Sequence, residues 1–319
     1  MAVSLPGLDS LRQQIDAVDL QLLALINQRA ALAAQVAAVK SSTLDEQAPG
    51  PVSFYRPERE AQVLRNIMKQ NSGPLPDADV ARLFREIMSA CLALEKPLRV
   101  EALGYPGSLA HLAALKHFGQ SIVPGQRADA ASLFADVESG RIDYAVLPFG
   151  SLLAGLDLSL TASAEAITEN YVSLFLQYNV QICGEVKILT TRADEPERQA
   201  EVGKARNAGK SQRFIVIGRG AVPASGDDRS SVITGIADRP GGLYHLLAPF
   251  DAMGISILRL EAKQGAGQIQ EPGEAAGEQF FVIDFPGHFS EDRVKRLCDA
   301  LKKLTSTFKF IGSYPNGVL

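Results

Sequence analysis

The chain has 319 residues, of which 46% are hydrophobic and 21% charged, and its formal net charge is −4. This composition is typical of a globular protein of two or three domains, and the charge excludes a general attraction to nucleic acid or anionic membranes. Three distant cysteines without metal-ligand spacing favour a reducing cytoplasm. We expect no secretion signal and no membrane span, because the N-terminus lacks a basic start and no stretch approaches about 18 apolar residues.

Residues 1–96 are predicted to form an all-helical domain of three helices. Apolar side chains recur at three- and four-residue steps from Leu8 to Val39, the pattern of a long helix buried along one stripe. Shorter helices are expected from Pro57 and from Asp77. A helix of roughly 30 residues extends about 45 Å, which two short helices cannot cover. We therefore expect a partner chain to cover it in an intertwined homodimer.

Basic side chains interrupt this apolar stripe. Arg29 falls on the stripe, and Arg12 and Lys40 lie beside it. Buried cations are costly without an anionic or polar partner, so the helix is expected to enclose an anion. Arg29 and Lys40 are three helical turns apart and can converge on one small anion. Four further candidates stand on the other two helices: Arg59, Glu60, Cys91 and Glu95. Such a set positions and stabilises charge rather than forming covalent intermediates.

Residues 97–220 are predicted to form a single α/β lobe. Strands and helices alternate along this segment, which favours a mostly parallel sheet. Strands are expected at 98–103, 144–147, 182–189 and 213–218, and helices at 108–118, 130–139 and 161–178. The stretch 191–211 is charged and nearly free of large apolar residues, so it is expected to be a linker or a solvated helix.

Residues 221–319 are predicted to form a small α+β domain. Strands are expected at 230–237, 255–262, 279–285 and 308–313, and helices at 242–253 and 290–304. This βαββαβ order makes an antiparallel sheet with two helices on one face.

Four segments of the helical domain carry a resemblance: LRQQIDAVD (11–19), LLALINQRAALAAQVAAVK (22–40), FYRPEREAQVLRNI (54–67) and LFREIMSACLALE (83–95). They are similar to the chorismate mutase domain that opens bifunctional chorismate mutase/prephenate dehydratase proteins. The resemblance implies a cytoplasmic enzyme of phenylalanine biosynthesis that needs no cofactor or metal and rearranges chorismate to prephenate.

The resemblance also implies a role for each charged residue. Arg29 and Lys40 would hold the carboxylates and ether oxygen of chorismate, and Arg12 would reach in from the second subunit. Arg59 would contact the other carboxylate, and Glu60 would hydrogen-bond a substrate hydroxyl.

Glu95 stands where some family members carry a glutamine that faces the ether oxygen, and Cys91, one turn earlier, is a further substrate-binding candidate. The rearrangement is one pericyclic step, so the enzyme has only to hold the compact conformer and stabilise charge on the breaking C–O bond. Lys40 can donate a hydrogen bond to that oxygen, whereas Glu95 can help only while protonated. We therefore expect the mutase to work better at mildly acidic pH.

The middle segment is similar to prephenate dehydratase but departs from the family pattern. The likeness is carried by ALGYPGSLAHLAALKHFG (102–119), FADVESGRIDYAVLPFGS (134–151), ICGEV (182–186) and QRFIVIG (212–218). The family's catalytic Thr-Arg-Phe stands here as Gln212-Arg213-Phe214. Family members insert a second lobe before that strand, where this chain has only 187–211, which is too short for such a lobe. We expect a truncated scaffold without dehydratase activity.

The last domain is similar to the ACT regulatory domain that closes the same proteins. Gly241, Gly242 and Leu243 stand where family members bind phenylalanine, and glycines there let the backbone approach a carboxylate. A plain strand-to-helix turn explains these residues equally well. The second family signature begins at Glu261 but continues differently, so the domain is expected either to bind an aromatic amino acid or to serve mainly in dimerisation.

Three other functions stay open. The chain could be a full bifunctional enzyme, a mutase acting on an amino analogue of chorismate in secondary metabolism, or a non-enzymatic sensor. Retention of every expected charge in the helical domain argues against the sensor.

Overall fold

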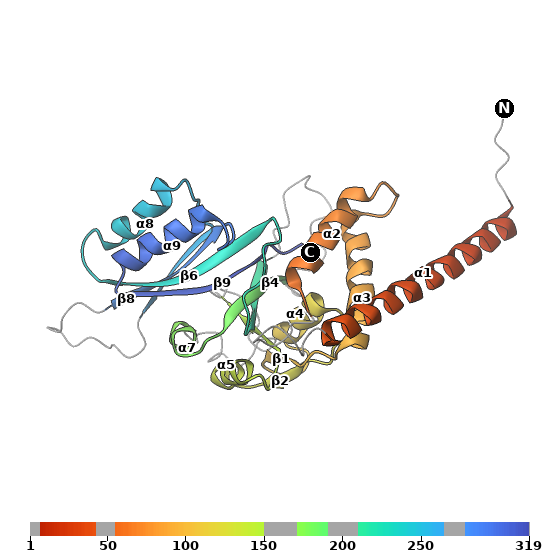
Figure 1. The fold of residues 1–319 in the computed structure, drawn as a ribbon, viewed down its shortest axis with the longest axis horizontal. Coiled ribbons are helices and arrows are strands. Elements are labelled where there is room, and N and C mark those ends of the chain that lie inside the picture. Colours follow the sequence, from red (N-terminus) through yellow and green to blue (C-terminus); the bar gives the residue numbers. More distant parts are fainter. Residues whose placement is uncertain (1–6, 43–54, 150–170, 191–209, 265–277, 319) are drawn as a thin grey trace, which may run out of the picture.

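The structure is a computed structural model that describes residues 7–42, 55–149, 171–190, 210–264 and 278–318. Along the chain it forms a helical domain, a domain built on a five-stranded sheet, and a domain built on a four-stranded sheet (Figure 1). Most of the expected helix 161–178 and nearly all of the expected linker 191–211 lie outside the described residues.

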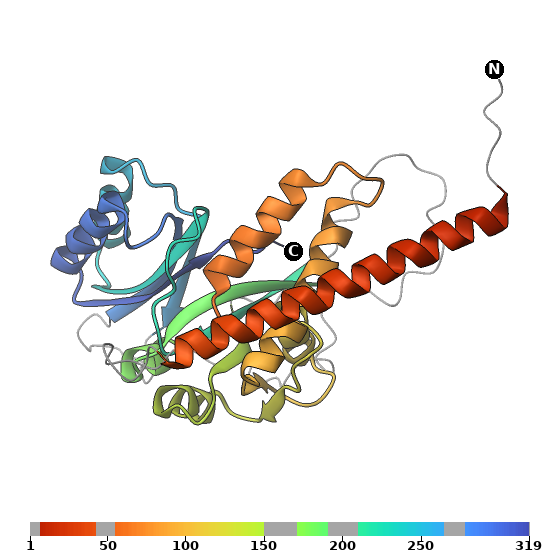
Figure 2. The same ribbon diagram turned by 45° about the vertical axis from the view of Figure 1, so that its right-hand side comes forward.

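The helical domain has the three predicted helices, α1 (Leu8–Ser42), α2 (Pro57–Gln70) and α3 (Asp77–Glu95). Pro57 occupies the first turn of α2, where its missing N–H costs nothing. The C-terminal half of α1 packs on α3, while its N-terminal half extends away from the rest of the molecule (Figure 2).

A single chain leaves the apolar stripe of α1 in solvent. Leu25, Leu32 and Val36 are 60%, 55% and 51% exposed. The partly buried face of α1 overlaps the edge of this stripe at Arg29 and also includes Ala33, Ala37 and Lys40. The burial that the apolar pattern predicts is therefore not provided within one chain.

The expectation that no stretch is long and apolar enough for a membrane span was wrong for α1, by length and composition alone. Among the described residues, α1 contains a stretch with a mean hydropathy of 1.4, enough to qualify as a candidate span. Alanines raise this mean although polar residues such as Gln28, Arg29 and Gln35 interrupt the apolar run. A helix that pairs with another chain has the same composition.

The middle domain follows the predicted alternation of strands and helices. Its elements are β1 (Val100–Leu103), α4 (Leu109–Phe118), β2 (Gly125–Arg127), α5 (Ala130–Ser139), β3 (Tyr144–Pro148), α7 (Val172–Gln177), β4 (Gln181–Thr190) and β5 (Lys210–Gly218). Side chains of Ser108 and Asp129 cap α4 and α5 by accepting hydrogen bonds from backbone N–H groups at 3.3 and 2.7 Å. Strand β2 was not predicted, because three residues are too short to show a period.

The predicted mostly parallel sheet is a mixed sheet, in which β5 runs opposite to the other four strands. The strand order is β2-β1-β3-β5-β4; β1 is parallel to β2 and β3, but β5 is antiparallel to β3 and β4. Strands β4 and β5 pair along their whole length, from Gln181 with Gly218 to Thr190 with Lys210. This hairpin pairing reverses the chain direction within the sheet, which helix-containing crossovers do not do.

The last domain has the predicted βαββαβ order: β6 (Asp228–Ala237), α8 (Gly242–Ala252), β7 (Arg259–Gln264), β8 (Glu278–Pro286), α9 (Asp292–Leu304) and β9 (Thr307–Pro315). Its antiparallel sheet has the order β7-β8-β6-β9, with α8 and α9 on one face (Figure 1). Side chains from the strands, such as Val282, Ile311 and Tyr314, also join the core around α5 and α7. The two sheets therefore share one hydrophobic core.

Candidate functional site

The structure brings three of the predicted site residues together where α1 packs on α3. Lys40 and Arg29 of α1 both act electrostatically on Glu95 at the end of α3. Burial raises the pKa of Glu95, and the two cations lower it by less, so the net direction is upward. We call Arg29, Lys40 and Glu95 the helical site. It combines two cations with a carboxyl group that keeps its proton to higher pH than usual.

Cys91 lies on α3 one turn before Glu95 and is 4% exposed. A free, buried thiol of this kind packs as a small apolar side chain. Cys91 is therefore a buried packing residue one turn of α3 before Glu95.

Arg12 lies far from the helical site of its own chain. It pairs with Asp9 at 3.5 Å, and its side chain is 66% exposed. Seventeen residues of helix separate it from Arg29, which corresponds to about 25 Å. Arg12 therefore takes no part in the helical site of its own chain.

Arg59 and Glu60, at the start of α2, are placed differently from each other. Arg59 is exposed. Glu60 receives a hydrogen bond from Arg85 Nε at 2.9 Å and interacts with the Tyr55 hydroxyl, on the side of α2 that faces the middle domain. Burial raises the pKa of Glu60, and Arg85 opposes that effect. In this single chain, Glu60 thus ties α2 to α3 through Arg85, which also donates a hydrogen bond to the carbonyl of Lys116 in the middle domain at 3.2 Å.

Sequence reasoning missed the polar cluster around Glu60. Tyr55 Oη lies 3.0 Å from Nε2 of His117, a residue of α4. Burial, reinforced by Arg85, lowers the pKa of His117 to about 3, so this imidazole is neutral at ordinary pH. A tyrosine and a histidine 62 positions apart give no local signal, and only packing brings them together.

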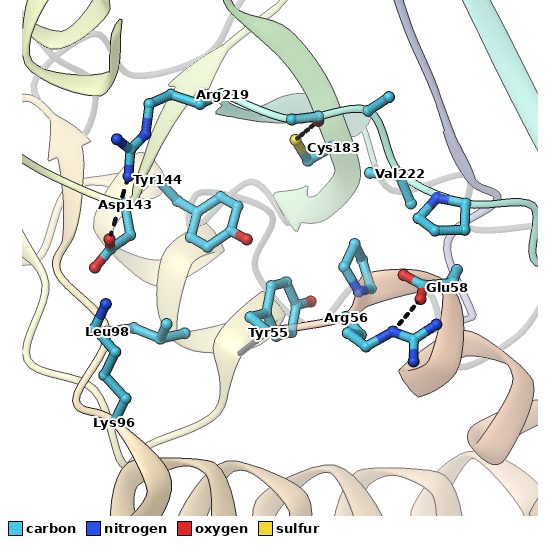
Figure 3. Close-up of a pocket in the computed structure, with 14 residues that line it drawn as sticks. Tyr55, Arg56, Glu58, Lys96, Leu98, Asp143, Tyr144, Cys183, Arg219 and Val222 are labelled. Carbon is cyan, nitrogen blue, oxygen red and sulfur yellow. Dashed lines mark hydrogen bonds and ion pairs between the residues drawn. The ribbon is translucent and has the colours of Figure 1, made fainter. Parts of the chain in front are cut away.

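A cavity of about 340 Å³ opens near this cluster (Figure 3). We call it the α2 cavity. It lies between the first turn of α2, the segment that follows α3, strand β3 and the segment after β5. Its walls include Tyr55, Glu58, Leu98, Tyr144 and Arg219. The sequence did not indicate this cavity.

The residues at the family's catalytic Thr-Arg-Phe position are buried. Gln212 is 2% exposed and its side chain donates a hydrogen bond to the carbonyl of Arg213 at 3.2 Å. Arg213 pairs with Glu185 at 2.8 Å and with Asp284 at 2.7 Å. These side chains hold the middle and last domains together.

The turn before α8 has the conformation that its glycines allow. Gly241 caps the helix at φ +80°, in the left-handed region, and Leu243 is 40% exposed. Glu261, on β7, pairs with Arg259 and with Lys263. Among the described residues, no group of three or more His, Cys, Asp or Glu side chains could hold a metal ion.

Two family models match the chain: Chorismate mutase type II over residues 11–96 and Prephenate dehydratase over residues 100–191. A bifunctional chorismate mutase/prephenate dehydratase of Pseudomonas aeruginosa is 33% identical over 380 residues, covering 98% of this chain and 98% of the relative. One from Stutzerimonas stutzeri is 32% identical with the same coverage.

Two solved structures resemble the fold. A prephenate dehydratase from Arthrobacter aurescens in complex with L-Phe has a TM-score of 0.51 and 18% identity, covering 69% of this chain and 90% of that one. GqqA, described as a novel type of quorum quenching acylase, has a TM-score of 0.51 and 20% identity, covering 68% and 95%. At these identities the likeness concerns the fold alone.

Proposed function

Because the chain belongs to the family of bifunctional chorismate mutase/prephenate dehydratases, we propose that it is a chorismate mutase of aromatic amino acid biosynthesis without dehydratase activity. The observation that supports the mutase proposal is the helical site, where the charges of Arg29 and Lys40 act on Glu95. Two cations suit a dicarboxylate substrate, and a protonated carboxyl group suits an oxygen that gains negative charge.

In this mechanism the protein supplies geometry and electrostatics. Arg29 binds a carboxylate of chorismate in the compact conformer. Lys40 and protonated Glu95 donate hydrogen bonds to the ether oxygen while its bond to carbon breaks. Arg59 contacts the second carboxylate, and Glu60 turns from Arg85 to a substrate hydroxyl when substrate binds. No protein group forms a covalent bond with the substrate.

We further propose that the enzyme is a cytoplasmic homodimer in which α1 helices pair. The exposed stripe around Leu25 and Val36 supports this arrangement, because a partner helix would remove it from water. Such pairing also gives Arg12 a role, since it can complete the helical site of the partner chain.

Three observations support the loss of dehydratase activity. Strands β4 and β5 are paired up to Thr190 and Lys210, so only residues 191–209 connect them. The alignment with the Pseudomonas protein runs over 380 positions against 319 residues here, which leaves at least 61 positions without a counterpart in this chain. In addition, Gln212 replaces the family's catalytic threonine and is buried.

The full bifunctional enzyme is the competing candidate. Both relatives carry both activities in their names, and the alignments cover 98% of each relative. The two candidates predict different products from the same substrate.

The deciding experiment incubates the purified protein with chorismate and measures chorismate, prephenate and phenylpyruvate by chromatography. We expect chorismate to be consumed and prephenate to accumulate in equal amount. Phenylpyruvate formed faster than in a protein-free control with prephenate would establish the bifunctional enzyme. Unchanged chorismate would refute the mutase. Arg29→Gln serves as the matched variant and should lower kcat/KM at least a hundredfold, about 2.7 kcal/mol of transition-state stabilisation.

We propose the last domain as an ACT-like regulatory domain. Its βαββαβ order and the left-handed turn at Gly241 support this assignment. An aromatic amino acid would bind with its carboxylate near Gly241 and Gly242 and its side chain near Leu243, with Glu261 as a candidate for the ammonium group.

A further inference from the structure

Glu58 presents an unsatisfied carboxylate oxygen at the α2 cavity. The residue is 3% exposed, and it lines the cavity at the first turn of α2 (Figure 3). Its Oε1 accepts a hydrogen bond from Arg56 Nε at 2.6 Å. Its Oε2 is buried and has no hydrogen-bond partner among the described residues. Burying a charged oxygen without a hydrogen-bond donor is unfavourable, and a ligand in the cavity could supply that donor.

Arg56 supplies the complementary charge at the same end of the cavity. Its contact with Glu58 uses only Nε, and its side chain is 54% exposed. No other described residue pairs with this guanidinium, so its remaining N–H groups can bind an anion in a fork geometry. A cation and an anion two residues apart match the ammonium and carboxylate groups of an α-amino acid.

The walls of the cavity are suited to an aromatic ring. Tyr55 and Tyr144 line it with their rings 5.5 Å apart in an edge-to-face arrangement, and Leu98 and Val222 add apolar surface. Figure 3 shows the Tyr144 ring between the Arg56–Glu58 pair and the ion pair of Arg219 with Asp143. A third ring placed here would gain edge-to-face contacts. The volume of about 340 Å³ is within the range of small-molecule sites.

We propose that the α2 cavity binds an aromatic α-amino acid, with its ammonium group on Glu58, its carboxylate on Arg56 and its ring against Tyr55 and Tyr144. This site is separate from the helical site and from the turn at Gly241. It does not depend on the proposed mutase activity, so either can fail alone.

The test measures binding directly on the full-length protein. The chain contains no tryptophan, so the fluorescence of added L-tryptophan can be followed without tryptophan emission from the protein. Calorimetry then compares L-phenylalanine with 3-phenylpropanoate, which lacks the ammonium group. We expect L-phenylalanine to bind at least tenfold more tightly. Equal affinities, or no binding of either L-tryptophan or L-phenylalanine, would overturn the proposal.

Variants assign the binding to this cavity. Combined with Leu243→Asp, which removes any ligand bound at the turn before α8, Glu58→Gln should remove the preference for L-phenylalanine over 3-phenylpropanoate, because the amide has no charge. Leu243→Asp, at the turn before α8, should leave binding to the α2 cavity intact. Asp299→Asn removes an acid on α9 that is 67% exposed, and it should change nothing. Loss of binding in Leu243→Asp but not in Glu58→Gln would place the ligand at the turn and refute the proposal.

Arg56→Gln keeps the proposal testable if Glu58→Gln does not fold. This variant should weaken the binding of L-phenylalanine at least tenfold. It should leave the affinity for phenethylamine, which has no carboxylate, unchanged. An equal loss for both ligands would show that the guanidinium does not bind the carboxylate.

Discussion

At the scale of single residues, Glu95 shows how the surroundings of a carboxyl group set its role. The group lies beside two cations, which favour its ionised form, but its burial is the larger effect and favours the protonated form. Protonated Glu95 can donate a hydrogen bond to a developing oxyanion, whereas the ionised group would repel it.

The first prediction concerns the pH dependence of the mutase. Since the pKa of Glu95 is raised, the group keeps its proton to higher pH than an ordinary glutamate, and its protonated fraction falls as the pH rises through that pKa. Mutase kcat/KM should fall over the same interval, as measured by chorismate consumption. Glu95→Gln donates at every pH and should give a flatter profile. A profile identical to that of the unchanged protein would remove Glu95 from the mechanism.

His117 gives a second prediction, on stability. Its folded pKa is about 3, below its ordinary value of 6.5, so only the unfolded chain gains its proton as the pH falls below 6.5. Stability is therefore lost from pH 6.5 downward, by about 2 kcal/mol between pH 7 and pH 5. The contribution of Glu60 to stability has the opposite pH dependence, because its pKa is raised in the folded protein. Burial raises the pKa of Tyr55 well above its ordinary value, so its hydroxyl stays protonated over that range.

The measurement is the free energy of unfolding in urea at pH 7 and pH 5. His117→Gln keeps a polar group for Tyr55 but does not titrate. Its free energy of unfolding should therefore fall by about 2 kcal/mol less between these pH values than that of the unchanged protein. His245→Gln alters an exposed histidine and serves as the control. Parallel pH dependences for all three proteins would contradict the prediction.

At the scale of secondary-structure elements, α1 is the helix whose apolar stripe a single chain does not bury. Its contact with α3 covers one face near Arg29 and Lys40, and the neighbouring apolar stripe remains in water. Helices that bury so little gain most of their stability from partners rather than from propensity.

The third prediction is that Leu25→Asp dissociates the proposed homodimer. Each subunit would lose the burial of one leucine, about 2 kcal/mol per side chain, so two copies weaken association roughly a thousandfold. Sedimentation equilibrium over a range of concentrations measures this. Val123→Asp changes a residue that is 92% exposed on the middle domain and should have no effect. An unchanged protein that is monomeric, or that floats with phosphatidylcholine vesicles, would refute the paired helix.

At the scale of the whole molecule, Arg213 connects two domains. It comes from β5 of the middle sheet and reaches Asp284 of β8 and the hydroxyl of Tyr314 in β9. Glu185 of β4 accepts hydrogen bonds from both Arg213 and Arg229, at 2.8 and 2.6 Å. The pair of Arg213 with Asp284 is electrostatic, because the two closest atoms lack hydrogen-bond alignment.

The fourth prediction is that Arg213→Met lowers the free energy of unfolding in urea by about 3–5 kcal/mol, since it leaves the buried carboxylate of Asp284 without its cation and removes one of the two arginines that pair with Glu185. Arg293→Gln removes a pair with Glu291 that is 47% and 39% exposed, and should cost about 0.5 kcal/mol or less. If the free energy of unfolding fell by equally little in both variants, the domains would be joined by apolar packing rather than by this cluster.

Local patterns predicted most elements of the fold. Apolar spacing and prolines placed α1, α2 and α3, and the βαββαβ order was readable from alternating apolar strands and amphipathic helices. Arg29 and Lys40 could be paired from their spacing alone, because a helix fixes the relation of residues along it. The identity of the family rests on the same local segments.

The remaining features depend on contacts between distant residues. Tertiary packing decided that β5 is antiparallel to β3, that Glu60 meets Arg85 and that Glu58 borders a cavity. A sequence determines which side chains one helix or strand presents on each face, because backbone geometry repeats with a fixed period. Which of those faces meet is set by how the apolar surfaces of the whole chain can be buried together, and that condition is global.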